Sequence, residues 1–137
     1  MFLSYLNRKE KLKFLDLAIY MVDIDSNPTE VEKRVVKSLF AEIGEDIVNE
    51  YSHEFRSDID TTINYFKESN QVVRNIIYFN LCRIAITDDL YNTTEHLFLE
   101  RLEEEYGISR EKRKQLVKCV YDERDLREKA LRVIREY

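Results

Sequence analysis

The chain has 137 residues, of which 44% are hydrophobic and 36% are charged, a composition that excludes a disordered protein. Only two glycines and one proline occur, which argues against a β-rich fold with its many turns. The formal net charge is −5, but residues 1–108 carry a balance of −9 and residues 109–137 a balance of +4. The body of the protein is therefore a poor general ligand for nucleic acid.

The chain opens on an apolar tag that either covers a helical bundle or contacts a second copy, made up of Phe2, Leu3 and Tyr5. Charged residues follow the tag, which is the reverse of the order in a secretory signal. Asn7 and Glu10 have the spacing of a capping box. Apolar residues then recur at helical intervals, so the first helix is expected to run to about Asp23.

A second helix follows an acidic turn. Thr29 and Glu32 form the next capping box, and Gly44 is placed to end this helix in the left-handed conformation that glycine adopts most readily. A short helix is then expected over residues 47–55. The helix after it opens at Ser57 with a weaker capping box.

The most apolar segment, QVVRNIIYFNLCRIAI, ends at Ile86 and predicts the central and most buried helix. Asn92 with Glu95 caps a further helix, which Gly107 ends. The last helical stretch begins after these residues and is expected to break near Asp122. Together these elements predict one all-α domain over residues 1–137, a compact bundle of about seven helices.

An internal repeat relates the two capped helices. Shifting the chain by 63 residues superposes both glycines and two acidic pairs, each an Asp followed seven residues later by a Glu. The matched residues are Asp25 with Asp88, Glu32 with Glu95, Leu39 with Leu102, Glu42 with Glu105, and Gly44 with Gly107. A single helical hairpin cannot bury its apolar face alone, so we expect the two helix-turn-helix copies to pack with pseudo-symmetry.

The repeat places four carboxylates in equivalent acidic turns. Each turn would fold the Asp at the end of one helix towards the Glu in the first turn of the next. Four carboxylates at one end of a bundle suit a hard divalent cation such as Ca²⁺, Mg²⁺ or Mn²⁺. Alternatively, the two Glu side chains only cap their helices, and the two Asp residues are ordinary turn residues. The candidate metal ligands are Asp25, Glu32, Asp88 and Glu95.

The two copies resemble the tellurite-resistance TerB-like family over about residues 8–120. The segments that carry the resemblance are LKFLDLAIYMVDIDSNPTEVEKRVVKSLFAEIG and IIYFNLCRIAITDDLYNTTEHLFLERLEEEYGIS. The resemblance implies an all-helical fold, metal binding at the four acidic positions, and a role in stress response or defence within membrane-associated protein complexes. The chain departs from the family pattern where Ser26 and Asp89 replace the glycine after each Asp, and where Pro28 replaces a hydrophobic residue.

Other chemistry finds little support in the sequence. An EF-hand fails because Pro28 occupies the position of the required glycine. Glu50 and His53 form one Glu-x-x-His pair where a di-iron bundle needs two, and His96 beside Glu95 is expected on the helix surface. The sequence has neither a phosphate-binding glycine loop nor a nucleophile motif, so we expect no enzyme activity.

The cysteines and the C-terminal charges bear on location and partners. Cys82 and Cys119 are isolated, so we expect buried thiols in a cytoplasmic protein rather than a disulfide or a zinc site. No apolar stretch is long enough to cross a bilayer. The stretch SREKRKQLVK either docks an acidic partner, a membrane surface or nucleic acid, or forms a solvated face braced by nearby acids. Its basic residues are Arg110, Arg113, Lys114 and Lys118.

These observations predict a non-enzymatic, TerB-like stress or defence module that acts through protein–protein contacts. It would carry a weak divalent-cation site in the acidic turns, and a homodimer is one form it could take. The alternative is a purely structural or regulatory helical bundle without a bound ion. In either case we expect neither nucleic-acid binding nor integral membrane insertion.

Overall fold

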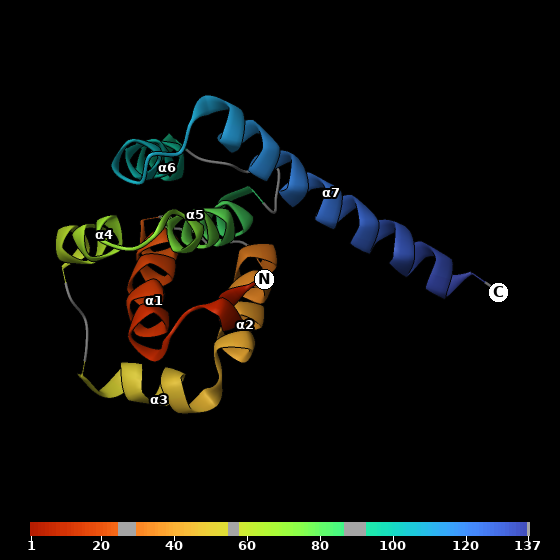
Figure 1. Cartoon of the computed structure of the whole chain (residues 1–137). Coiled ribbons are helices and arrows are strands. Elements are labelled where there is room, and N and C mark those ends of the chain that lie inside the picture. Colours follow the sequence, from red (N-terminus) through yellow and green to blue (C-terminus); the bar gives the residue numbers. More distant parts are fainter. Residues whose placement is uncertain (25–29, 55–57, 87–92, 137) are drawn as a thin grey trace.

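The computed structural model describes residues 1–24, 30–54, 58–86 and 93–136, and this part of the chain contains helices and no strand (Figure 1). The all-α prediction is confirmed. The elements are η1 (Leu3–Tyr5), α1 (Arg8–Asp23), α2 (Glu30–Ile43), α3 (Glu45–Glu54), α4 (Ile59–Lys67), α5 (Gln71–Ile86), α6 (Thr93–Glu105) and α7 (Arg110–Arg135).

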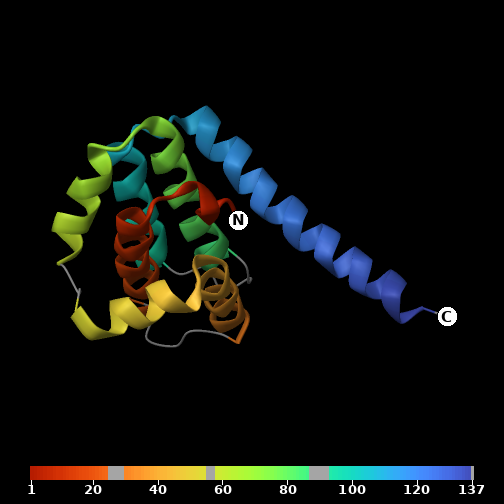
Figure 2. The same ribbon diagram turned by 60° about the horizontal axis from the view of Figure 1, so that its bottom comes forward.

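Helix α5 is the centre of the bundle, as its apolar sequence predicts. It packs against α1, α2, α4, α6 and α7, and its residues from Ile76 to Ile86 are all buried. Its neighbours contribute their own apolar faces to the same core, which includes Phe14, Leu17, Leu39, Phe66 and Leu102. Helix α7 starts against the bundle and then extends away from it, so the C-terminal end lies far from every other element (Figures 1 and 2).

The ends of several helices follow the predicted local chemistry. The Asn7 side chain accepts a hydrogen bond from the Glu10 backbone, and the Glu10 side chain accepts one from the Asn7 backbone, which completes the capping box of α1. Gly44 and Gly107 have φ values of 107° and 66°, so both glycines adopt the left-handed conformation expected after a helix. Ser109 caps α7 by accepting a hydrogen bond from the Lys112 backbone.

Two boundary predictions are wrong, and others fall outside the described residues. Helix α4 is capped by Asp58, whose side chain accepts from the Thr61 backbone at 3.0 Å. Helix α7 is continuous through Asp122 because no glycine or proline interrupts its apolar spacing. The cap residues that lie outside the described residues are Thr29, Ser57 and Asn92.

The 63-residue offset also appears in the bounds of the helices. Helix α1 spans residues 8–23 and α5 spans residues 71–86, so both ends of α5 lie 63 residues beyond those of α1. Helices α2 and α6 begin at residues 30 and 93, again 63 apart. The pattern that relates the two sequences therefore also sets the lengths of the helices. A pseudo-symmetric relation between the two hairpins in space stays a prediction.

The predicted N-terminal tag is divided between the core and the surface. Leu3 is fully buried, whereas Phe2 and Tyr5 are 51% and 72% exposed. The Leu3 backbone donates a hydrogen bond to the Glu42 carboxylate at 3.1 Å, which fixes η1 against α2. The Asn80 side chain of α5 donates to the Met1 carbonyl at 2.8 Å. The tag therefore covers the bundle at Leu3.

One buried polar cluster joins three helices of the body. The Asp16 carboxylate of α1 accepts hydrogen bonds from Tyr51 of α3 at 2.8 Å and from Thr62 of α4 at 3.0 Å. Asp16 and Thr62 are both buried, and such charge-assisted hydrogen bonds offset the cost of removing a carboxylate from water. Among the described residues, no helix combines the length and the apolar character needed to cross a membrane.

Candidate functional site

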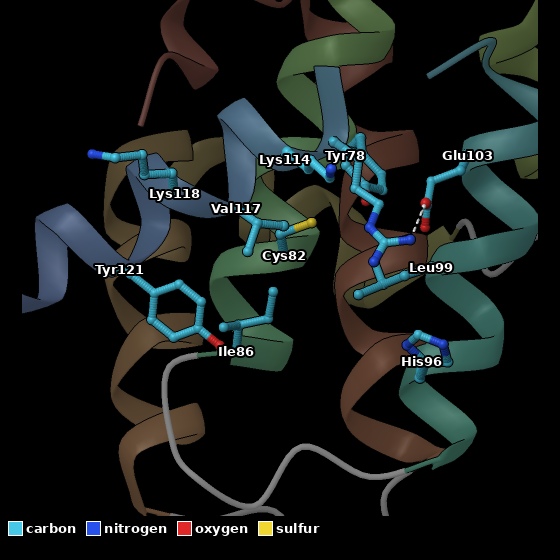
Figure 3. Close-up of a pocket in the computed structure, with 11 residues that line it drawn as sticks. Tyr78, Cys82, Ile86, His96, Leu99, Glu103, Lys114, Val117, Lys118 and Tyr121 are labelled. Atoms are coloured by element: carbon cyan, nitrogen blue, oxygen red, sulfur yellow. Dashed lines mark hydrogen bonds and ion pairs between the residues drawn. The ribbon is translucent and has the colours of Figure 1, made fainter. Parts of the chain in front are cut away.

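A cavity of about 450 Å³ lies between α5, α6 and α7 (Figure 3). Helical spacing explains which side chains reach it. Tyr78, Cys82 and Ile86 follow each other at intervals of four residues and so share one face of α5. The remaining lining residues are His96, Leu99 and Glu103 of α6 and Arg113, Lys114, Val117, Lys118 and Tyr121 of α7.

The floor of this cavity is apolar. Cys82 is fully buried, and Ile86 and Leu99 are 7% and 2% exposed. Val117 of α7 packs against the same core, and in Figure 3 it lies above Cys82. An apolar side chain of a ligand would find van der Waals partners on all three helices here.

The rim of the cavity is mainly basic and comes from α7. Arg113 forms an ion pair with Glu103 at 3.4 Å, which links α7 to α6 (Figure 3). Lys118 pairs with Asp122 of its own helix at 2.9 Å. Lys114 has no ion pair with any residue that the structure describes. Three basic side chains thus line the cavity against the single carboxylate of Glu103.

Burial changes the acidity of three groups in the cavity. It raises the pKa of the Glu103 carboxyl, although Arg113 and the Tyr78 hydroxyl favour its charged form. Burial raises the pKa of the Tyr78 hydroxyl well above its usual range. It also raises the pKa of the Cys82 thiol to about 12. Cys82 therefore stays protonated at neutral pH and is a weak nucleophile.

His96 lies at the edge of the same cavity. Its Nε2 atom is 2.8 Å from the Glu100 carboxylate of the next turn of α6, and the side chain is partly exposed. In Figure 3 the imidazole lies below Glu103 on the same helix. The sequence places His96 on the helix surface, and its partial exposure at the edge of the cavity agrees with that prediction.

The structure describes two of the four predicted metal ligands. Glu32 and Glu95 are 1% and 0% exposed, and each is the third residue of its helix, the position that a capping box requires. Asp25 and Asp88 lie outside the described residues. Within the described ranges, no three His, Cys, Asp or Glu residues come together as a metal centre would require. The four-carboxylate site stays a prediction.

The basic stretch predicted from the sequence supplies most of the rim. Arg113, Lys114 and Lys118 line the cavity, whereas Arg110 is exposed at the start of α7. Sequence reasoning did not single out Tyr78 or Glu103. The spacing of Tyr78 marks an inward face of α5, but only the packing of α7 beside α6 leaves a space above it.

The thiol prediction is half right. Cys82 is buried, but Cys119 is exposed, and both are free thiols. Cys119 lies on the outer face of α7, because Val117 and Val120 are the residues that turn towards the body. The side chain of His53 lies outside the part of the chain that the structure describes in full.

Comparisons with protein-family models, with curated proteins and with solved structures find no match to this chain. The TerB-like resemblance therefore rests on the sequence segments quoted above.

Proposed function

We propose that this chain is a non-enzymatic, TerB-like helical module that acts through protein–protein contacts in stress response or defence. The cavity between α5, α6 and α7 is the contact site, and its occupant is an acidic segment of a partner protein that carries an apolar anchor residue. The observation behind this proposal is the combination of an apolar floor with a basic rim in one cavity.

The rim gives the partner segment its charge. Among the lining residues, Arg113, Lys114 and Lys118 face one carboxylate, so a segment carrying Asp or Glu gains from placing its acids beside them. Lys114 is available for such a contact without breaking any ion pair among the described residues. Electrostatic complementarity of this kind favours an acidic partner over a basic one.

The floor gives the segment its anchor. Cys82, Leu99 and Val117 present apolar surface at the bottom of a cavity of about 450 Å³, which accommodates a side chain such as Leu or Phe. A buried apolar anchor with charges at the rim is the usual composition of a protein contact site. Nucleic acid fits less well, because the rest of the chain is strongly acidic.

A binding experiment with a defined probe tests the contact site. The probe is a fluorescein-labelled peptide that combines several Glu residues with one Leu, and a Lys-for-Glu version of it serves as the probe control. We expect the acidic peptide alone to bind, with an affinity that falls as salt is added. Lys114→Glu with Lys118→Glu should weaken binding by about tenfold or more.

The matched control is Lys112→Glu, which changes a Lys of the same helix that is exposed and does not line the cavity. It should bind the acidic peptide as the unaltered protein does. Equal affinity of all three proteins would contradict the contact site and favour a purely structural or regulatory bundle. A gel shift with duplex DNA at physiological salt separates the nucleic-acid alternative.

The stress or defence role is tested in cells rather than on the cavity. Deleting the gene in its source organism should increase sensitivity to tellurite, and the unaltered gene should restore resistance. Restoration by the Lys114→Glu, Lys118→Glu variant would show that the role does not depend on this cavity. Unchanged tellurite sensitivity after the deletion would count against the family resemblance.

A further inference from the structure

The distal part of α7 carries an apolar stripe that the body of the protein does not cover. Leu126 and Ile134 are 66% and 76% exposed, and Val120 is the only buried residue of α7. Figures 1 and 2 show this part of the helix pointing away from the bundle. The stripe consists of Leu126, Ala130, Leu131, Val133 and Ile134, whose spacing of three and four residues places them on one side of the helix.

A groove of about 460 Å³ runs from this stripe to the bundle. Val120, Leu131 and Ile134 of α7 line one side, and Val35 of α2 lines the other. A helix that covered the stripe would therefore also meet the body of the molecule. Isolated helices about 12–15 residues long are only marginally stable in water, so this part of α7 gains from a covering partner.

The charges of the same segment identify the partner. Between residues 122 and 125 there are three acidic side chains and one basic, and between residues 129 and 135 there are three basic and none acidic. A second α7 running in the opposite direction would set each acidic part beside a basic part. A parallel neighbour would instead set like charges together.

We propose that the distal part of α7 is a self-association face, which pairs antiparallel with α7 of a second copy of this chain. A pair centred near Leu126 sets Asp122 opposite Lys129 of the second copy and Arg124 opposite Glu128 of the second copy. These pairs lie on the two edges of the apolar stripe, where ion pairs set partner choice and direction in helix pairs.

The same arrangement fills the groove. Val133 and Ile134 of the second copy, which lie beyond the centre of the pair, come beside Val120 and the groove next to Val35. Because the relation is two-fold, each copy fills the groove of the other, and the contact closes at two chains. The contact site proposed above uses the other side of α7 and stays open in the pair.

Sedimentation equilibrium of the full chain at physiological salt tests the proposal. We expect a monomer–dimer equilibrium with a dissociation constant in the micromolar range, since a single helix pair is a small interface. Leu126→Glu and Ile134→Glu should each raise that constant by about tenfold or more. The matched control is Leu97→Glu, because Leu97 of α6 is also 58% exposed but lies outside the stripe.

Charge reversal tests the direction of the pair. Asp122→Lys and Lys129→Asp should each weaken the dimer, and the double variant should restore it, because both ion pairs reappear with their signs exchanged. Loss of the dimer in the double variant would overturn the antiparallel arrangement. A chain that stays monomeric at all concentrations, or a dimer that Leu126→Glu leaves intact, would overturn the self-association face. Far-UV circular dichroism of each variant checks that the helices persist.

Discussion

Arg83 and Glu123 form a bidentate ion pair that joins the central helix α5 to α7. The Nε atom of Arg83 donates to one carboxylate oxygen at 2.9 Å, and its Nη2 atom donates to the other at 2.8 Å. The two side chains are only 9% and 19% exposed. Planar, bidentate geometry in a shielded place makes this pair stronger than an exposed one. It holds α7 at the point where that helix leaves the bundle.

Removing the carboxylate should loosen α7. We expect Glu123→Ala to lower the free energy of unfolding by about 1.5–3 kcal/mol, because the buried guanidinium loses a charged hydrogen-bond partner. Urea unfolding followed by circular dichroism measures the change. Glu128→Ala, an exposed position one turn further along α7, should change the stability by less than about 0.5 kcal/mol. Equal effects of the two substitutions would contradict a stabilising role for the pair.

Glu103 should make stability depend on pH. Burial raises the pKa of its carboxyl in the folded protein, so the folded state binds this proton more tightly than the unfolded state does. The stabilisation from this group is then fully present below the unfolded pKa, near 4.3, and is lost as pH rises through the folded value. Glu103→Gln removes the effect, so its stability relative to the unaltered protein should rise with pH in that window.

The measurement is urea unfolding of both proteins at a series of pH values from about 4 to 7. Glu104→Gln is the control, because it removes a carboxyl from the neighbouring, exposed position of α6. The stability difference between Glu103→Gln and the unaltered protein should increase over this range. A difference that falls with pH would mean that the ion pair with Arg113 outweighs the burial of Glu103.

The two glycines should differ in how they tolerate substitution. Both have positive φ, so Gly44→Ala and Gly107→Ala should each cost about 1 kcal/mol or more. At Gly107 the φ of 66° lies in the left-handed region that Asn adopts readily, so Gly107→Asn should recover part of the loss. At Gly44 the φ of 107° lies outside it, and Asn should recover little. Thermal melts of the four variants check this contrast.

The metal prediction has its own test. If Asp25, Glu32, Asp88 and Glu95 share a divalent cation, millimolar Ca²⁺, Mg²⁺ or Mn²⁺ should raise the melting temperature, because only the folded chain assembles the ligands. Asp25→Asn with Asp88→Asn should abolish the rise. If the two glutamates act only as helix caps, the melting temperature is independent of these ions. Removal of the Thr29 or Asn92 side chain then costs about 0.5–2 kcal/mol.

The helices could be predicted from the sequence because their signals are local. The capping box at Asn7, the apolar run that ends at Ile86, and the glycines at 44 and 107 each act within a few residues. The errors are also local. Asp58 rather than Ser57 caps α4 because adjacent polar residues can serve the same role, and α7 continues past Asp122 because its apolar spacing is unbroken.

The cavity could be predicted only in part, because it depends on how helices meet. The sequence identifies the basic residues of α7, since Arg113, Lys114 and Lys118 are close together in the chain. Glu103 and Tyr78 lie on two other helices and carry no motif that connects them with α7. Their shared position follows from the angle at which α7 crosses α5 and α6, which residue spacing within one helix does not specify.

The two free thiols make the protein its own reporter of local opening. Cys119 is exposed on α7, whereas Cys82 is buried under that helix. A thiol reagent should therefore modify Cys119 at once and Cys82 only when α7 lifts from α5. The slow phase of labelling measures the rate and free energy of that detachment without unfolding the rest of the chain.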